Sequence, residues 1–134
     1  MSQHRKILIV DDEPDMRIFL SVLSKTNGYI PFVARNGSEG MKQIKEICPD
    51  LIFLDIMMPG EGGIRMYQSI RTDADLCLTP IIMLSAVKKG TFLHYLAMLN
   101  SQLETNIPEP DRYLEKPPEP EVILQTIRSV LNET

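Results

Sequence analysis

Most of the short apolar runs in this 134-residue chain end in a polar side chain that could take part in chemistry. In chain order, the runs end in Asp11-Asp12, Asp55, Ser85 and Lys116. If these groups converge, the carboxylates raise one another's pKa unless a cation neutralises them. Carboxylate oxygens are ligands for Mg²⁺, which commonly binds one or two carboxylates together with phosphate oxygens of a substrate. No His or Cys stands at these positions to favour zinc, so the residue types favour Mg²⁺.

Each of these residues, taken alone, has a simpler interpretation. Residues 11–13 could cap a helix and complement its dipole, and Asp55 could belong to a turn. Ser85 could be another helix cap, and Lys116 could be a solvated surface charge. However, every predicted strand except the one assigned to the sheet edge contributes a suitable group, and chance is a poor explanation for that coincidence.

The elements that must position these groups are short apolar runs bounded by turn signals, which is typical of strands buried on both faces. The runs are Ile7–Val10, Tyr29–Ala34, Leu51–Leu54, Ile81–Leu84 and Tyr113-Leu114. Pro31 lacks the backbone N–H that a central strand donates on both sides, so its run is assigned to the edge of the sheet.

Amphipathic stretches separate the runs. Apolar residues recur at helical spacing from Met16 to Leu23, Met41 to Ile47, Phe92 to Leu103 and Ile123 to Leu131, with a weaker pattern from Gly63 to Arg71. Five alternations of strand and helix predict one α/β domain over residues 1–134, a doubly wound parallel sheet with helices on both faces. Ligands of such sheets bind beyond the carboxyl ends of the strands, where the polar groups stand.

Composition excludes several other classes of protein. The chain has 14 Lys and Arg against 18 Asp and Glu, a net charge of −4, so we expect no direct nucleic-acid binding. Cys48 and Cys77 form no CxxC motif or Cys/His cluster, and we expect buried, reduced thiols. The apolar run at residues 7–10 is too short for a signal peptide, and no run is long enough to span a membrane. We therefore expect a cytoplasmic chain that does not bind membranes.

Taken together, the motifs resemble the receiver domain of bacterial two-component response regulators, including the chemotaxis regulators. The motifs are Ile9-Val10-Asp11-Asp12-Glu13, Leu54-Asp55-Ile56-Met57-Met58-Pro59 followed by Gly63, Met83-Leu84-Ser85-Ala86, and Tyr113-Leu114-Glu115-Lys116-Pro117. They cover essentially the whole chain in the family's order, and the set is far more specific than any one of them. The resemblance implies a flavodoxin-like fold with five helices and strand order 2-1-3-4-5.

The resemblance also implies a role for each acidic residue. Asp55 would be the phosphoacceptor, taking a phosphoryl group from a phosphohistidine of a sensor histidine kinase or a phosphotransfer protein. Asp12 and Asp55 would bind Mg²⁺, with the backbone carbonyl of Met57 as a third ligand and Asp11 in support. These roles suit phosphoryl transfer, in which catalysis is mainly positioning and charge neutralisation. Such a domain is a signalling module that catalyses only its own phosphorylation and dephosphorylation.

Phosphorylation would be detected by three further residues. The resemblance implies that Ser85 hydrogen-bonds one phosphoryl oxygen and Lys116 another, while Tyr113 is the switch aromatic that turns inward. The face of the fourth helix, fifth strand and fifth helix would then control an unknown downstream protein or domain, or support phosphorylation-dependent homodimerisation. The peptide bond between Lys116 and Pro117 would be cis. The alternative for Tyr113 is a half-buried aromatic with a hydrated hydroxyl.

The chain departs from the family pattern around its fourth helix. Lys116 follows Ser85 by 31 residues, longer than is usual for the family, and the connection Glu104–Asp111 contains two prolines. We expect the fourth helix to turn an apolar stripe to the core and polar residues to solvent. The stripe is Phe92, Leu96, Leu99 and Leu103, and the residues left toward solvent are His94, Tyr95, Asn100 and Gln102. The segment Thr91–Asp111 is then expected to determine partner specificity, the alternative being a tolerated surface insertion.

Three other functions fit less well. An enzyme with an aspartyl-phosphate intermediate usually needs a second carboxylate two residues after the nucleophile, and Met57 stands there. A nucleotide-binding enzyme needs a phosphate cradle, and residues 60–63 match neither GxGxxG nor GxxxxGK[ST]. An interaction module without phosphorylation would not need the acidic set. Because few residues follow the fifth helix, we expect no DNA-binding domain in these residues, which could be a whole protein or part of one.

Overall fold

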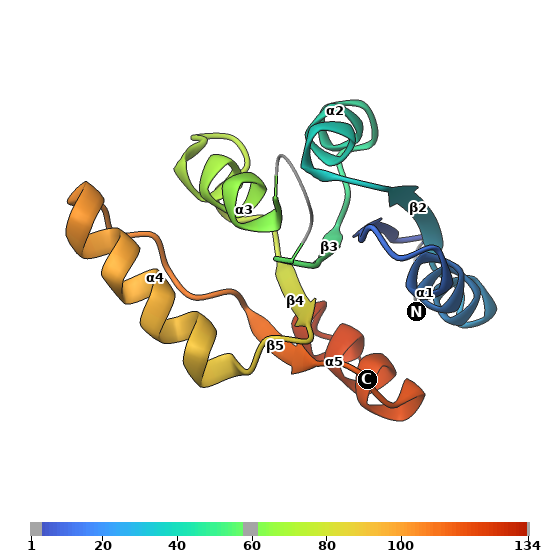
Figure 1. The fold of residues 1–134 in the computed structure, drawn as a ribbon. Helices are drawn as coiled ribbons and strands as arrows, with labels where there is room; N and C mark the ends of the chain where they lie inside the picture. Colours follow the sequence, from blue (N-terminus) through green and yellow to red (C-terminus); the bar gives the residue numbers. More distant parts are fainter. Residues whose placement is uncertain (1–3, 58–61, 134) are drawn as a thin grey trace.

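Five parallel strands form the centre of the molecule in a computed structural model that describes residues 4–57 and 62–133. They are β1 (Lys6–Val10), β2 (Ile30–Ala34), β3 (Leu51–Leu54), β4 (Ile81–Ser85) and β5 (Arg112–Glu115). Their order is β2-β1-β3-β4-β5, and a helix joins each strand to the next (Figure 1). The motif residues Met58 and Pro59, and Gly60 and Glu61 after them, lie outside the described residues.

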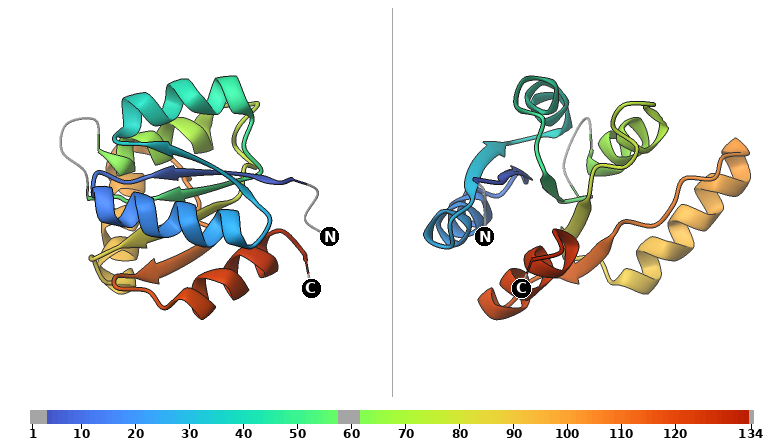
Figure 2. Two further views of the ribbon diagram at one scale, coloured as in Figure 1. Left: turned by 90° about the vertical axis from the view of Figure 1, so that its right-hand side faces the viewer. Right: turned by 180° about the vertical axis from the view of Figure 1, so that it is seen from behind.

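Helices cover both faces of this sheet: α1 (Pro14–Thr26), α2 (Gly37–Ile47), α3 (Gly63–Thr72), α4 (Lys89–Leu103) and α5 (Pro120–Val130). α1 and α5 lie on one face, and α2, α3 and α4 lie on the other (Figures 1 and 2). The core divides in the same way, with Leu20 and Ile123 in one cluster and Ile44, Ile70 and Phe92 in the other. The expected doubly wound α/β fold is confirmed. In the described part of the chain, no helix is long and apolar enough to cross a membrane.

Burial along the strands separates the centre of the sheet from its edges. Every residue of β3 and β4 is buried, whereas β2 and β5 include exposed residues. Pro31 lies in the edge strand β2, as predicted. The register pairs Val10 with Leu54. Because both strands end at this pair, Asp11 and Asp55 follow at the same edge of the sheet.

The end of α4 differs from the prediction. Phe92 and Leu96 are buried as expected, but Leu103 is 54% exposed. The helix ends at Leu103, and Glu104 takes a left-handed conformation with a φ of 53°, which turns the chain back. Ile107 then packs into the core and is only 6% exposed. The connection after α4 therefore supplies an apolar residue to the core, whereas Leu103, which helical spacing assigns to the core, lies largely in solvent.

Asn100 does not simply face solvent, because the connection after α4 uses its side chain. Its amide nitrogen donates to the carbonyl of Ile107 at 2.9 Å. Its amide oxygen accepts from the N–H of Ile107 at 2.9 Å and from the hydroxyl of Thr105 at 2.8 Å. One partly buried side chain thus satisfies three polar groups of the connection, which is why a polar residue occupies this position.

The α3 helix holds the other end of the same connection. The Tyr67 hydroxyl donates to the carbonyl of Pro108 at 2.5 Å. Arg71, whose side chain is almost fully buried, pairs with Asp111 at 3.0 Å, and Asp111 also accepts from the N–H of Ile81 at 2.7 Å. The segment Glu104–Asp111 is therefore fastened to the body of the protein by side chains of two helices.

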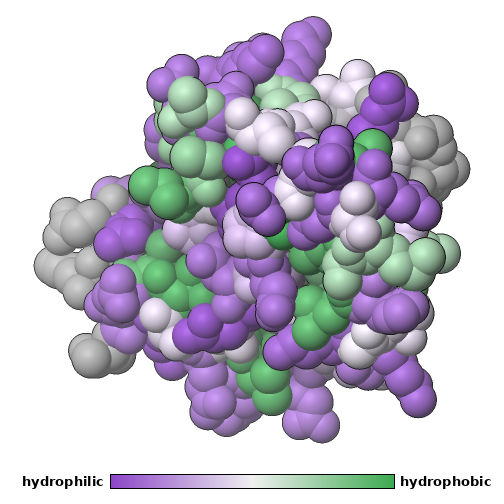
Figure 3. All heavy atoms as spheres, turned by 90° about the vertical axis from the view of Figure 1, so that its left-hand side faces the viewer, coloured by the Kyte–Doolittle hydropathy of each residue, from purple (hydrophilic) through white to green (hydrophobic). Residues whose placement is uncertain are grey.

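The outward side of α4 carries apolar residues. Tyr95 and Met98 are each 48% exposed. Tyr95 borders an apolar groove of about 330 Å³ whose lining also includes Ile64 of α3 and Met57. Figure 3 shows this side of the molecule, where apolar residues reach the surface among hydrophilic ones. The polar residues His94 and Gln102 are exposed, as expected.

The cysteines are less buried than expected. Cys48 is exposed at the end of α2, where its left-handed conformation, with a φ of 50°, closes the helix. Cys77 is half-buried in the connection between α3 and β4. Both are free thiols, and their positions are set by a helix end and a surface turn rather than by the core.

Candidate functional site

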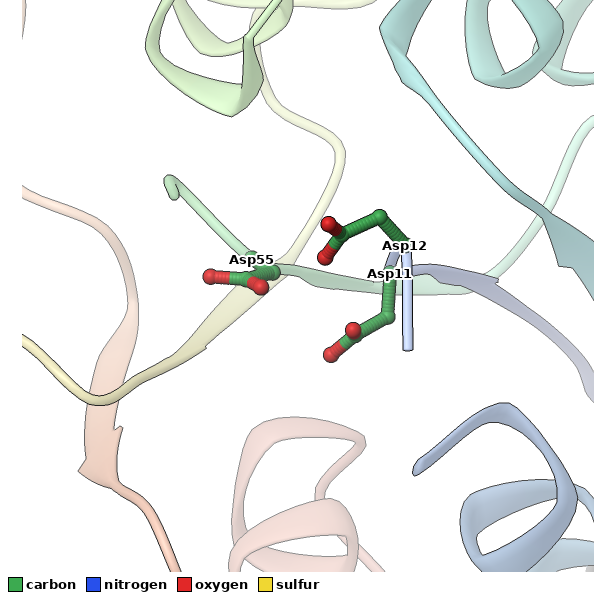
Figure 4. Close-up of side chains that lie close together, drawn as sticks. All are labelled: Asp11, Asp12 and Asp55. Atoms are coloured by element: carbon green, nitrogen blue, oxygen red, sulfur yellow. The ribbon is translucent and has the colours of Figure 1, made fainter. Parts of the chain in front are cut away.

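The carboxyl edge of the sheet carries a pocket with charges of both signs. Asp11 and Asp12 follow β1, Asp55 follows β3 and Lys116 follows β5. Carboxylate oxygens of the three aspartates lie within 4.8 Å of one another, and Figure 4 shows their side chains close together. A cavity of about 290 Å³ opens here, and its lining is Asp12, Glu13, Asp55, Met57, Ala86 and Lys116. The structure therefore brings together most of the site residues predicted from the sequence.

Asp55 is a buried carboxylate that lies close to Asp11 and Asp12 and contacts the Lys116 ammonium. It is 4% exposed, its Oδ1 accepts from the N–H of Met57 at 3.0 Å, and its Oδ2 accepts from Lys116 at 3.2 Å. Burial raises the pKa of the Asp55 carboxyl, and these contacts only partly offset that effect. The first residue of α3 must be glycine, because a Cβ on Gly63 would lie 1.8 Å from the Asp55 carbonyl oxygen.

Asp11 is the second buried carboxylate of the pocket. Its Oδ1 accepts from the N–H of Glu13 at 2.9 Å, and its Oδ2 lies 3.0 Å from the ammonium of Lys116. Burial raises the pKa of this carboxyl as well, with the nearby charge of Asp55 adding to the effect. Asp12 is more exposed than Asp11 and Asp55. The pocket thus has two buried carboxylates and a third at its opening.

Lys116 supplies a positive charge to this pocket. Its side chain is 11% exposed and contacts Asp11, Asp55 and also Glu13. Burial alone would lower the pKa of the ammonium, but the hydrogen bonds to Glu13 and Asp11 outweigh that effect and raise the pKa above its usual value. The peptide bond between Lys116 and Pro117 is cis, which confirms the prediction.

The donor set of the pocket fits a hard divalent cation. Asp11, Asp12 and Asp55 offer carboxylate oxygens, and the described residues that line the cavity include no His or Cys. The single charge of Lys116 compensates only part of the negative charge of these carboxylates. A divalent ion bound by oxygen ligands would neutralise the rest, and Mg²⁺ prefers such ligands.

Ser85 and Tyr113 lie beside this cavity rather than in its lining. Ser85 is fully buried, and its hydroxyl oxygen accepts from the N–H of Val87 at 3.1 Å. The Tyr113 hydroxyl donates to the carbonyl of Val87 at 2.5 Å, and its ring stacks on Phe92 with centroids 5.3 Å apart. Burial raises the pKa of Tyr113. The two predicted switch residues therefore meet at the turn between β4 and α4, and the Tyr113 hydroxyl has a protein partner.

Glu13 is a pocket residue that sequence reasoning missed. Helix capping was the simpler interpretation of residues 11–13, yet the side chain of Glu13, the residue before α1, makes no capping hydrogen bond. Its carboxylate instead binds Lys116, which is 103 residues away in the sequence. One sequence signal argued against a capping role for Glu13: Ser, Thr, Asp and Asn are the preferred capping residues, and glutamate is not among them.

The fold and the pocket define a flavodoxin-like α/β protein with a candidate cation site at the carboxyl edge of its sheet. Residues 7–128 match the model of the response regulator receiver domain. The chain therefore belongs to the response regulator receiver domain family, and the resemblance inferred from its motifs is confirmed.

Individual relatives differ in how much of their length this chain covers. The DNA-binding response regulator MtrA of Mycolicibacterium smegmatis is 30% identical over 130 residues, which are 97% of this chain and 52% of MtrA. Protein PilH of Pseudomonas aeruginosa is 29% identical over 126 residues, 94% of this chain and 97% of PilH. Among solved structures, a Francisella response regulator receiver domain matches with a TM-score of 0.78 at 26% identity, covering 96% of this chain and 97% of that domain. The chain thus spans about half of MtrA and nearly all of PilH.

Proposed function

We propose that this chain is a phosphorylation-dependent receiver domain, residues 1–134, that accepts a phosphoryl group on Asp55. The donor would be a phosphohistidine of a sensor histidine kinase or of a phosphotransfer protein. The observation that carries the proposal is the buried Asp55 carboxylate, which lies beside the Asp11-Asp12 pair and contacts the Lys116 ammonium. Placing carboxylates so close together opposes their ionisation, and clusters of groups with shifted pKa values are typical of functional sites.

In the proposed reaction, an Asp55 carboxylate oxygen attacks the phosphorus atom of the phosphohistidine. The bond between phosphorus and the imidazole nitrogen breaks as the new bond between phosphorus and oxygen forms, and its electron pair leaves with the imidazole. Negative charge spreads over the phosphoryl oxygens during this transfer. Lys116 already lies 3.2 Å from Asp55, so its ammonium can pair with one of those oxygens.

Asp12, Asp55 and the backbone carbonyl of Met57 would hold Mg²⁺, with Asp11 in support. When bound, the ion would supply charge neutralisation for the phosphoryl oxygens. The N–H of Met57 already donates to Asp55 Oδ1, which keeps this backbone beside the carboxylate. The part of the cavity lining that the structure describes has no His or Cys, which supports an oxygen-preferring ion.

Phosphorylation would be transmitted through Ser85 and Tyr113 to the face formed by α4, β5 and α5. A phosphoryl group on Asp55 offers a new acceptor to the Ser85 hydroxyl, which now accepts from Val87. Val87 is also the partner of the Tyr113 hydroxyl, so movement of one contact alters the other. The downstream partner would be another protein, a domain of a longer chain such as the DNA-binding part of an MtrA-like regulator, or a second copy of this domain. The segment Thr91–Asp111 would determine which partner binds.

Labelling with a small phosphodonor tests the proposal. Incubation with phosphoramidate and Mg²⁺, followed by borohydride reduction and peptide mapping, should locate one modified residue, Asp55. EDTA should prevent the modification, and Asp55→Asn should not be labelled. Asp75→Asn, which alters an exposed aspartate after α3, is the matched control and should be labelled like the wild type. Labelling of Asp55→Asn as strong as that of the wild type would contradict the proposal.

A further inference from the structure

Glu13 occupies a helix-capping position but directs its carboxylate to the pocket. It is the N-cap residue of α1, yet it makes no side-chain hydrogen bond to the helix, and the first helical residue is Pro14. Proline restricts the residue before it to extended backbone, and Glu13 has a φ of −87° and a ψ of 117°. The backbone at this point is therefore constrained while the side chain is available for another partner.

That partner is Lys116, and Glu13 contacts the acidic pocket in a second way. Its side-chain carboxylate accepts a hydrogen bond from the Lys116 ammonium, and its backbone N–H donates to Asp11 Oδ1 at 2.9 Å. Asp11 in turn lies 3.0 Å from the same ammonium. Glu13 thus contacts Lys116 directly, and its backbone also holds Asp11, a second carboxylate that contacts Lys116.

We propose that Glu13 is a positioning residue that holds the Lys116 ammonium against the Asp55 carboxylate, which it contacts at Oδ2. An ammonium group has three N–H donors, and here they meet Glu13, Asp11 and Asp55. With two donors held by Glu13 and Asp11, the third stays directed at Asp55, where the incoming phosphoryl oxygens need it. This inference rests on the proposed function, since it assigns Glu13 a part in the same reaction.

The alternative is an ordinary surface ion pair. Glu13 is 59% exposed, and exposed pairs commonly contribute little. The two roles differ in what they change. A mere surface charge affects how strongly an anionic phosphodonor is repelled, and therefore KM, whereas a residue that orients Lys116 affects the rate of transfer from bound donor, and therefore kcat.

Steady-state labelling with phosphoramidate at saturating Mg²⁺ separates these roles. We expect Glu13→Gln to lower the maximal rate about threefold to fivefold, the size of effect given by losing one partly exposed charge contact. Asp15→Asn is the matched control, because Asp15 is an exposed acidic residue in the first turn of α1 and is not a partner of Lys116. It should leave the maximal rate unchanged. A wild-type maximal rate in Glu13→Gln, with only KM altered, would overturn the inference.

Binding of beryllofluoride, a phosphoryl mimic, gives a readout that does not depend on turnover. Its affinity in saturating Mg²⁺ can be measured by ¹⁹F NMR for the wild type, Glu13→Gln, Lys116→Ala and the double variant. Because Glu13 acts through Lys116, Glu13→Gln should weaken binding in the wild-type background but not in the Lys116→Ala background. Equal weakening in both backgrounds would overturn the inference.

The failure of this inference is distinguishable from failure of the proposed function. If the wild type neither becomes labelled on Asp55 nor binds beryllofluoride, the proposed function fails and this inference fails with it. If the wild type does both and Glu13→Gln matches it in both assays, only the role of Glu13 is refuted. Thermal unfolding of Glu13→Gln should match the wild type, because its side chain is largely exposed.

Discussion

Asp11 and Asp55 lie where hydrophobic burial alone would not place a carboxylate. Both are almost fully buried, and burial raises the pKa of each. A raised pKa in the folded state means that folding disfavours the ionised form, so at neutral pH these residues oppose folding. Each also has a compensating contact with Lys116. A neutral residue of the same shape at either position would serve stability better, which is typical of residues retained for function.

We expect Asp55→Asn to stabilise the metal-free protein at pH 7 by roughly 1–2 kcal/mol, the usual range for a stabilising substitution. The sign follows from linkage: a carboxyl whose pKa is higher in the folded state than its ordinary value of 3.8 opposes folding only where it is ionised. The stabilisation should therefore be present at pH 7 and should shrink as the pH falls toward 3.8. Urea unfolding in EDTA across this range measures it.

The exposed variant Asp75→Asn is the control for that experiment, and its unfolding free energy should stay within about 0.5 kcal/mol of the wild type. If Asp55→Asn proved less stable than the wild type at pH 7, the contact with Lys116 would outweigh the cost of burying Asp55.

Among the elements, α3 approaches Asp55 so closely that its first residue has no room for a side chain. A Cβ on Gly63 would lie 1.8 Å from the Asp55 carbonyl oxygen, whereas a Cβ on Gly90, in the first turn of α4, would meet nothing within 4 Å. We expect Gly63→Ala to cost more than about 2 kcal/mol, because backbone rather than a flexible side chain must move.

Gly90→Ala should instead leave stability unchanged or raise it by up to about 1 kcal/mol, through helix propensity. Urea unfolding of the two variants, together with phosphoramidate labelling, measures both effects. Gly63→Ala should also lose labelling, because the clash displaces Asp55 itself. Equal stability of the two alanine variants would refute the close packing of α3 on the site.

Asn100 organises the connection that follows α4. We expect Asn100→Ala to destabilise the protein by roughly 1–3 kcal/mol, because it leaves the N–H and carbonyl of Ile107 without their partner. Gln102→Ala changes an exposed polar residue two positions later on the same helix and should have little effect. Hydrogen exchange at the Ile107 amide reports the loss directly. Unaltered protection of that amide in Asn100→Ala would show that other contacts order the connection.

These elements also show what could be predicted from the sequence. Strands and helices were predictable because the apolar runs are bounded by turn signals and the helical spacing is regular, and parallel strands bring Asp11 and Asp55 to one edge. The end of α4 was not predictable, because helical spacing alone assigns Leu103 to the core. In the structure Glu104 is left-handed, Asn100 bonds to the backbone of Ile107, and Ile107 rather than Leu103 is buried. The orientation of the Glu13 side chain depends in the same way on a distant partner.

For the molecule as a whole, the long connection Glu104–Asp111 is not a loose insertion. It is held by side-chain contacts with α3, and its residue Ile107 packs in the core. Arg71 of α3 donates to the carbonyls of Cys77 and Thr79 and pairs with Asp111, which leads into β5. Because Ile107 lies in the core, replacing Glu104–Glu109 with a Gly-Ser link would remove core packing as well as surface. Partner specificity in the segment Thr91–Asp111 is therefore better tested on the exposed residues Tyr95 and Met98 than by shortening the chain.

Cation binding at the acidic pocket would stabilise the whole domain. Asp11 and Asp12 are distant in sequence from Asp55, so the pocket exists only in the folded chain, and a bound cation favours folding by mass action. We expect Mg²⁺ at 100 times its dissociation constant to add about 2.7 kcal/mol to the unfolding free energy relative to EDTA. The thermal midpoint should rise by several degrees.

The increment from Mg²⁺ should also depend on pH and on Asp12. Cation binding needs ionised carboxylates, and burial raises the pKa of Asp11 and Asp55, so the increment should shrink as the pH is lowered below neutrality. Thermal unfolding with Mg²⁺, and with NaCl of equal ionic strength, measures the specific part at each pH. Asp12→Asn should lose most of the increment because it removes one carboxylate of the cluster, whereas Asp75→Asn should keep it. An increment that survives in Asp12→Asn would place the cation elsewhere on this acidic protein.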